Sequence, residues 1–343
     1  MNVIIVDKKG SALWLVAKNR EKTGLYKVFA AFDYVQPSSM LSDIVKLNPK
    51  TIIFAWRSCI GFLANDLNSM RLLRKLSNDT RIAVLIPDHL STEQVCRKGH
   101  VDPLEFADYF LVTSNKLHDI YQKSPYSEKL GGVLHDIPDV QYIENIYRGK
   151  RDIRSEQTII WVGNSRWGVN QGFKDHKGLA SLMLPAFKFA SKSFTNLQLS
   201  VIDSSKKRLD NHEVLEKIYS SNLLVQTSKS EGTGLPIVEA SGLGVLVLTT
   251  NVGVAEELLK DELEFLICSF NPEDLALKII SAIPREKELN IQLRDAYNNY
   301  ILIALQETLD PKKFIKNTGT WRRKNGKKFI SLIWLIRFLR SKN

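Results

Sequence analysis

Glu231 and Glu239, two glutamates separated by seven residues, form the pattern in the chain that most suggests chemistry. An apolar run typical of a strand precedes them, and a helical pattern follows from Pro236, a residue favoured at the first helical position. Glu231 is therefore predicted on a loop and Glu239 on the first helical turn. The amides of Gly234 and Leu235 would lie between them, because glycine admits close approach to the backbone and a helix N-terminus attracts anions.

This spacing suits the binding of a nucleotide-activated sugar. One carboxylate would accept hydrogen bonds from sugar hydroxyls and the other from ribose hydroxyls, while the backbone amides between them would hold the phosphates. Each such hydrogen bond to a carboxylate contributes roughly 1.5–3 kcal/mol. The alternative is that Glu231 is an ordinary turn residue and that Glu239 is only stabilised by the helix dipole.

A second polar loop, residues 164–178, follows a predicted strand and leads into a predicted helix. Arginine grips phosphate oxygens with two hydrogen bonds, lysine acts as a point charge, and the helix start adds its dipole. The loop is thus a candidate diphosphate site, with the candidate residues Asn164, Ser165, Arg166 and Lys177. The alternative is a surface loop with solvated basic residues.

Short apolar runs recur between amphipathic segments along the chain. They predict strands at 3–6, 51–56, 81–86, 108–113, 158–163, 197–202, 222–227 and 245–250, and helices around 61–77, 177–192, 210–220 and 271–283. Near-continuous apolar runs are typical of buried parallel strands, and their alternation with helices predicts an α/β fold with doubly wound sheets. In such sheets ligands bind beyond the carboxyl ends of the strands, where both polar loops are predicted to lie.

The alternation pauses in a polar segment, residues 134–157, which predicts a boundary between two Rossmann-like domains. We predict an N-terminal domain over 1–140, a linker over 141–157, a C-terminal domain over 158–290, a closing helix over 291–310 and a basic tail over 311–343. No repeat at a solenoid period interrupts this order.

The positive charge of the chain belongs to the tail. The net charge is +11, with 48 basic and 37 acidic residues, and residues 311–343 hold eleven Lys and Arg and no acid. A nucleic-acid enzyme more often carries its positive charge around the active cleft, so no nucleic-acid partner is expected. The apolar run at 327–342, flanked by cations, instead suits an inner-membrane surface or a membrane protein partner. Docking of this segment on the N-terminal domain stays open.

Three scattered cysteines, Cys59, Cys96 and Cys268, form no zinc-binding spacing and suggest a reducing compartment. The N-terminus lacks the pattern of a signal peptide, and no run of 18 apolar residues predicts a membrane span. We therefore expect a cytoplasmic protein that is peripheral on the cytoplasmic face of the membrane.

Several motifs in one order resemble the retaining glycosyltransferases of GT-B fold, especially family 4. The segment EGTGLPIVEA (231–240) is similar to that family's Glu-x7-Glu signature, with Thr233 where an aromatic residue is usual. The segment VGNS…DHKG resembles its phosphate loop, and TNVGVAEEL (250–258) resembles another of its motifs, with Val254 in place of a glycine. The segment FADYFLVTSNKLHDIY (106–121) resembles a motif of its first domain.

The resemblance implies transfer of a sugar from a nucleotide-sugar donor to a glycan, such as a lipid-linked glycan in bacterial surface-polysaccharide synthesis. It implies that Glu231 contacts the transferred sugar and Glu239 the ribose. Lys177 and Arg166 would neutralise the diphosphate, which would make a metal unnecessary. No Asp-x-Asp motif stands at a strand end, in agreement with metal independence.

In the first domain, the resemblance implies that a histidine near His89 faces the reacting sugar, and that the loop containing Gly10 faces the donor phosphates or the acceptor. Two other classes stay open on the sequence alone. A nucleotide-sugar epimerase would turn over without an acceptor, and a non-catalytic binding protein of the same fold would bind a donor without turnover.

Overall fold

The computed structural model describes residues 1–55, 59, 60, 63, 67–76, 79–88, 107–149 and 157–310. Within these ranges the chain forms two compact units. Unit 1 comprises the described residues up to Ile137 together with residues 304–310, and unit 2 comprises those within Pro138–Ile303. His89 and the predicted tail, residues 311–343, lie outside the described residues.

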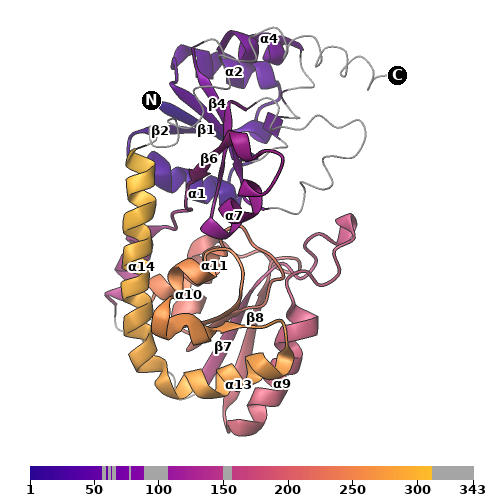
Figure 1. Cartoon of the computed structure of the whole chain (residues 1–343), viewed down its shortest axis with the longest axis vertical. Helices are drawn as coiled ribbons and strands as arrows, with labels where there is room; N and C mark the ends of the chain where they lie inside the picture. The colour runs from indigo at the N-terminus through magenta and orange to yellow at the C-terminus, as the bar shows by residue number, and fades with distance from the viewer. Residues whose placement is uncertain are drawn as a thin grey trace. The chain divides into compact units, whose positions relative to one another are not determined.

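Unit 1 contains a six-stranded parallel sheet in the order β2-β1-β3-β4-β5-β6 (Figure 1). The strands are β1 (Asn2–Val6), β2 (Tyr26–Ala30), β3 (Thr51–Phe54), β4 (Arg81–Ile86), β5 (Tyr109–Val112) and β6 (Leu130–Val133). The helices around it include α1 (Ala12–Glu21), α2 (Pro37–Lys46), α4 (Leu67–Leu76) and α7 (Asn115–Gln122).

The sheet of unit 1 buries an apolar core on each face, as a doubly wound sheet requires. Alternate residues of β1 point to opposite sides, so Val3 and Ile5 join the core formed with α2, α4 and α7, whereas Ile4 and Val6 join the core formed with α1. Helices α2 and α4 lie side by side over the first core (Figure 1). The burial of both faces explains why the central strands read as continuous apolar runs.

The strands of unit 1 that sequence analysis missed lie at the two edges of its sheet. Strand β2 alternates buried and partly exposed residues, because one of its edges and part of one face are open. Strand β6 contains two glycines, Gly131 and Gly132, which weaken its strand signal. The predicted strands at 3–6, 51–56, 81–86 and 108–113 are confirmed to within two residues.

Unit 2 contains a five-stranded parallel sheet in the order β11-β10-β9-β7-β8. The strands are β7 (Gln157–Gly163), β8 (Leu197–Asp203), β9 (Leu223–Gln226), β10 (Leu246–Thr250) and β11 (Ile267–Cys268), the last too short to predict. The helices are α8 (Val140–Tyr147), α9 (Leu184–Ala190), α10 (Asn211–Tyr219), α11 (Leu235–Gly242), α12 (Ala255–Leu258), α13 (Pro272–Ala282) and, up to Ile303, α14 (Glu286–Leu309).

Two local features of unit 2 bear on the predicted boundaries. Asn271 caps α13 by accepting a 2.8 Å hydrogen bond from the amide of Glu273, and Pro272 is the first helical residue. Residues 141–147, which sequence analysis places in a linker, form most of α8, which packs on α10 and α11. The rest of that segment includes residues 150–156, which lie outside the described residues.

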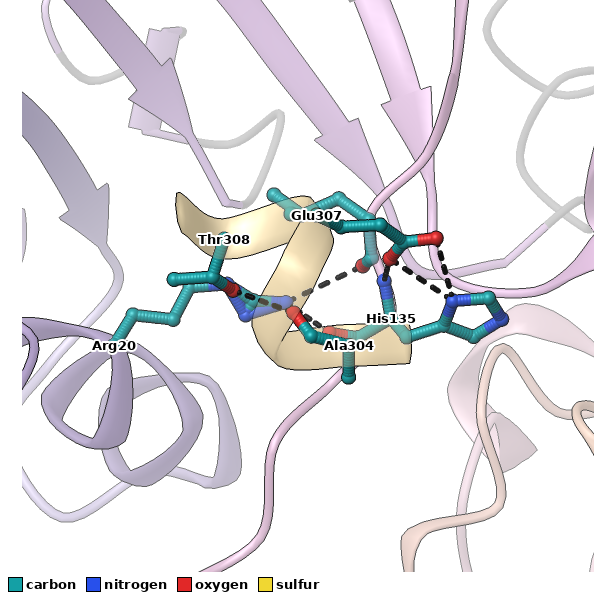
Figure 2. Close-up of polar contacts among 6 residues, drawn as sticks. Arg20, His135, Ala304, Glu307 and Thr308 are labelled. Atoms are coloured by element: carbon teal, nitrogen blue, oxygen red, sulfur yellow. Dashed lines mark hydrogen bonds and ion pairs between the residues drawn. The ribbon is translucent and has the colours of Figure 1, made fainter. Parts of the chain in front are cut away.

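The last residues of α14 belong to unit 1 and are held there by polar contacts (Figure 2). The carboxylate of Glu307 accepts hydrogen bonds from the backbone N–H of His135 at 2.9 Å and from its ring Nδ1 at 3.0 Å. The hydroxyl of Tyr26 donates to the carbonyl of Thr308 at 3.1 Å, and Arg20 donates to the carbonyl of His135. These groups are all buried, so the end of α14 is part of the packed interior of unit 1.

Candidate active site

Loops that follow neighbouring strands of unit 2 are bound to each other at the carboxyl edge of the sheet. After β7, the carbonyl of Lys177 accepts a 2.7 Å hydrogen bond from the hydroxyl of Thr227, which follows β9. The carbonyl of His176 accepts a 2.9 Å hydrogen bond from the amide of Lys229. These contacts place the two polar loops singled out from the sequence against each other.

Two glycines allow these loops to meet backbone to backbone. Gly178 has a φ of +68°, and a Cβ there would lie less than 3.0 Å from the carbonyl oxygen of Thr227. Gly253, after β10, has a φ of +55°, and a Cβ there would lie less than 3.0 Å from the carbonyl oxygen of Thr233. Only glycine meets both demands, the left-handed backbone and the missing side chain.

The centre of this edge is an ion pair between Lys177 and Glu231. The two side chains are only 16% and 18% exposed, and the hydroxyl of Ser228 donates a 2.5 Å hydrogen bond to the same oxygen of Glu231. The sequence predicted both charged residues as site members but not their direct pairing. Ser228 was missed, although its position three residues before Glu231 at the start of the loop was visible in the sequence.

Glu239 lies deeper than the sequence suggested. Helix α11 begins at Leu235, so Glu239 is its fifth residue and lies in the second turn, not in the first. Its side chain is buried, at 3% exposure, and its Oε1 has no hydrogen-bond partner. Burial raises the pKa of Glu239 to about 7, and a hydrogen bond from Asn211 only partly offsets this. A buried carboxyl with an unused acceptor is able to receive a hydroxyl of a ligand.

The helix that follows Lys177, which begins at Leu179, and helix α11 differ in whether a side chain already caps the N-terminus. Asp175 caps the helix that begins at Leu179, because its carboxylate accepts hydrogen bonds from the amides of Ser181 at 2.6 Å and Ala180 at 3.4 Å. The expected free helix start after Lys177 is therefore capped by the protein itself. Helix α11 has no side-chain cap: Gly234 precedes it with a φ of +74°. The anion-binding character of a helix start is thus better preserved at α11.

The other loop residues predicted to bind a donor occupy different environments. Ser165 donates a 2.6 Å hydrogen bond to Asp203, and its amide lies 3.1 Å from the same carboxylate. Burial raises the pKa of Asp203, but the hydrogen bonds from Ser165 and Ser205 outweigh it and lower the value to about 2. Asn164 accepts from the amide of Arg166 at 3.0 Å, and Arg166 itself is exposed.

The candidate residues of unit 1 are less defined. Gly10 lies on the loop after β1 with a φ of +73°, and among the described residues other than its chain neighbours no atom lies within 4 Å of the place of a Cβ. In the same loop Ser11 donates a 2.5 Å hydrogen bond to the buried Asp7 and caps α1. Trp14 packs against the adjacent core. The candidate His89 lies outside the described residues.

Part of unit 2 matches the model of a known protein family. Residues 180–301, which include both glutamates, match the family of glycosyl transferases group 1. The chain is a glycosyltransferase with the GT-B fold. No curated protein sequence matches it significantly.

Solved structures similar to this glycosyltransferase cover nearly its whole length. A sucrose-phosphate synthase from Thermosynechococcus elongatus is 14% identical, covers 92% of this chain and 99% of its own, and has a TM-score of 0.59. A glycosyltransferase from Rickettsia africae gives the same values. Anabaena HepE, solved in complex with UDP and glucose, is 15% identical, with 91% and 100% covered and a TM-score of 0.56. At this level of identity the likeness establishes the fold.

Two further observations concern the described part of the glycosyltransferase. There, no three His, Cys, Asp or Glu side chains are grouped so as to hold a metal ion. None of the helices in that part has both the length and the hydropathy needed to cross a bilayer.

Proposed function

We propose that this glycosyltransferase moves a sugar, with retention of its anomeric configuration, from a nucleotide-sugar donor to a lipid-linked glycan in polysaccharide synthesis. The observation that carries the donor assignment is the Lys177–Glu231 pair beside the uncapped start of α11. A cation, a carboxylate and a free helix terminus at one edge of a sheet supply what a nucleoside diphosphate and its sugar require. The complex of HepE with UDP and glucose supports this choice of donor class.

Each residue has a proposed part in the transfer. Lys177, with Arg166, offsets the negative charge that grows on the nucleoside diphosphate as its bond to the sugar breaks. Glu231 binds hydroxyls of the transferred sugar, and the amides of Gly234 and Leu235 bind phosphate oxygens. Because these groups provide the positive charge, we propose that no metal ion takes part.

The proposed role of Glu239 follows from its burial. One of its oxygens is without a partner, so a ribose hydroxyl that donates to it satisfies a buried acceptor. Satisfying such a group contributes roughly 1–3 kcal/mol. Because the pKa of this carboxyl is about 7, donor binding through it is expected to favour the ionised form.

The acceptor and the location are proposed from the sequence of the tail. Eleven cations and an apolar run within residues 311–343 support attachment to the cytoplasmic face of an anionic membrane, where lipid-linked glycans are assembled. We also propose that His89 faces the reacting sugar and that the loop containing Gly10 faces the donor phosphates or the acceptor.

The donor assignment is tested by thermal shift with UDP-, GDP- and dTDP-sugars. One of them should raise the melting temperature, because a ligand at 100 times its Kd stabilises the folded state by about 2.7 kcal/mol. The Lys177→Gln variant should lose most of that shift. If none of the donors moves the melting temperature of the wild-type protein, the proposal is wrong.

The stereochemical and acceptor assignments need separate measurements. Proton NMR of the first product should show the anomeric configuration of the donor, and inversion would refute retention. Transfer to a lipid-linked glycan in vesicles of anionic lipid should exceed transfer to the same glycan free in solution. Equal rates would remove the membrane part of the proposal.

A further inference from the structure

Trp167, on the loop after β7, faces the lysine of the candidate site. The Nζ of Lys177 lies 5.5 Å from the centre of the Trp167 ring system. The face of an indole attracts a cation through its quadrupole, and more strongly where water is excluded. The side chain of Lys177 is only 16% exposed, so its ammonium has lost much of its hydration. The ring of Trp167 replaces part of that hydration.

Trp167 is itself held firmly. Its amide donates a 3.0 Å hydrogen bond to the carbonyl of Asn164. Its ring lies 4.6 Å from the ring of His176, tilted by 34°, and 5.8 Å from the ring of Phe173. The three rings form one aromatic cluster, so Trp167 has little freedom to leave Lys177.

The backbone of the loop is shaped to form this aromatic cluster. Gly168 has a φ of +72°, and its carbonyl accepts a 3.0 Å hydrogen bond from the amide of Phe173. A Cβ at Gly168 would lie 2.8 Å from the ring of Phe173, so glycine is required where the loop folds back. The loop therefore brings Phe173 under Trp167.

The third ring of the cluster adds no charge that would repel the lysine. His176 is buried, and its Nε2 donates to the carbonyl of Ser230 at 3.2 Å. Burial, with the nearby charge of Lys177, lowers the pKa of His176, so its imidazole is neutral at pH 7. Trp167 therefore rests on a neutral, fixed support that joins the loops after β7 and β9.

We propose that Trp167 is a positioning residue, which holds Lys177 in place while the ionic partner of this lysine changes from Glu231 to the diphosphate of the donor. The inference rests on the proposed function. A bound diphosphate competes with Glu231 for Lys177, and release of Glu231 allows it to turn to the sugar hydroxyls. Without the ring, the lysine side chain has to be ordered during binding, which lowers affinity. The loss affects only ligands that carry the diphosphate.

The test compares binding of a nucleoside diphosphate with binding of its bare nucleoside, measured by calorimetry. UDP, GDP and dTDP are the probes, and the tightest of them is used. Trp167→Leu should weaken the diphosphate about 3- to 10-fold, the range of a partly buried cation–π contact, and leave the nucleoside unchanged. Trp167→Phe, which keeps a ring and serves if the leucine variant fails to fold, should lose about two-fold.

Two controls separate positioning from a general structural role. Phe270 lies under Lys229 at 5.4 Å in the same unit, so Phe270→Leu removes the same kind of contact away from Lys177 and should change neither affinity. In a Lys177→Met background, Trp167→Leu should cause no further loss of diphosphate affinity. Additive losses in the two variants would contradict the inference.

The outcomes distinguish this inference from the function on which it rests. If the wild-type protein binds no nucleoside diphosphate, the proposed function fails and takes the inference with it. If Lys177→Met weakens the diphosphate but the Trp167 variants bind like the wild type, the inference alone is overturned. Equal weakening of diphosphate and nucleoside in Trp167→Leu would show that the ring only supports the fold.

Discussion

A largely buried pair between a carboxylate and a nitrogen base occurs in each unit, and these two pairs differ in the groups that bind the carboxylate. In unit 1, Glu307 is bound by the backbone N–H and the ring of His135 (Figure 2). In unit 2, Glu231 is bound by Lys177 and Ser228, which are both side chains. The first carboxylate is tied to the main chain, whereas the second is held only by groups that are able to rotate away.

This difference indicates opposite roles. Glu307 and His135 are 5–9% exposed and 172 residues apart in sequence, so their contact fastens the end of α14 into unit 1. Glu231 and Lys177 keep 16–18% exposure and lie at the carboxyl edge of a sheet, where ligands bind. We infer that the first pair serves stability and that the second serves binding.

The largest expected effect comes from breaking the pair in unit 1. Glu307→Ala leaves the N–H and the ring nitrogen of His135 buried without their acceptor, and should lower the free energy of unfolding by about 3–5 kcal/mol. Urea unfolding followed by circular dichroism measures this. Glu288→Ala removes an exposed pair with Arg285 from the same helix and should leave stability unchanged. Nucleotide affinity of folded Glu307→Ala should equal that of the wild type, and a selective loss of affinity would contradict the assigned roles.

In unit 2, breaking the pair is expected to reduce activity much more than stability. Glu231→Gln keeps an oxygen that accepts from Lys177 and Ser228, so the free energy of unfolding should fall by only about 1–3 kcal/mol, less than in Glu307→Ala. Sugar transfer should fall about 100- to 1000-fold, because the charge that holds the reacting sugar is lost. Initial rates with the donor found by thermal shift measure this. A variant that loses stability in step with activity would place Glu231 in the same class as Glu307.

The sequence was sufficient to select the candidate residues of unit 2 from local motifs. Glu231, Lys177 and Glu239 stand in short motifs whose order along the chain is visible without a structure. The motifs cannot show which side chains meet, however. The pairing of Lys177 with Glu231 and the ring of Trp167 depend on how two loops, 54 residues apart for the ion pair, fold against each other.

The burial of Glu239, the cap of one helix and the edge strands of unit 1 were also not predicted. The pattern around Glu239 indicates a helix but not that its second turn is sealed from solvent. The N-terminus of the helix after Lys177 was expected to be free, but Asp175, with a φ of +44°, caps it. The spacing of residues in the sequence does not show this cap. Strands β2 and β6 were not predicted, because their edge positions and the glycines of β6 weaken the apolar run that indicates a strand.

A smaller effect is the pH dependence of stability that Glu239 causes. The pKa of Glu239 is about 7 in the folded protein and 4.5 in the reference state, so the folded protein retains a proton that the unfolded chain releases between these values. Its contribution to stability is complete below about pH 4.5 and decreases by about 3 kcal/mol as the pH rises to about 7. Urea unfolding at several pH values measures this.

The matched control for this prediction is Glu239→Gln, which cannot titrate. His176, whose pKa is lowered, gives a slope of opposite sign, because the unfolded chain takes up its proton first as the pH falls. The difference between wild type and Glu239→Gln removes that contribution. If the difference is flat between pH 5 and 7, Glu239 is more hydrated than its burial implies.

The smallest expected effect compares the first loops of the two sheets. Gly10 after β1 and Gly178 after β7 both have left-handed backbones, so alanine at either position costs about 1–2 kcal/mol. Only at Gly178 does the added Cβ also meet a fixed carbonyl, that of Thr227, which adds about 1–3 kcal/mol. Gly178→Ala should therefore be less stable than Gly10→Ala by about 2 kcal/mol in urea unfolding. Equal losses of unfolding free energy in the two variants would mean that the loop around Gly178 adjusts to a Cβ as easily as the loop around Gly10. The backbone contacts of Gly178 would then not fix the position of Lys177.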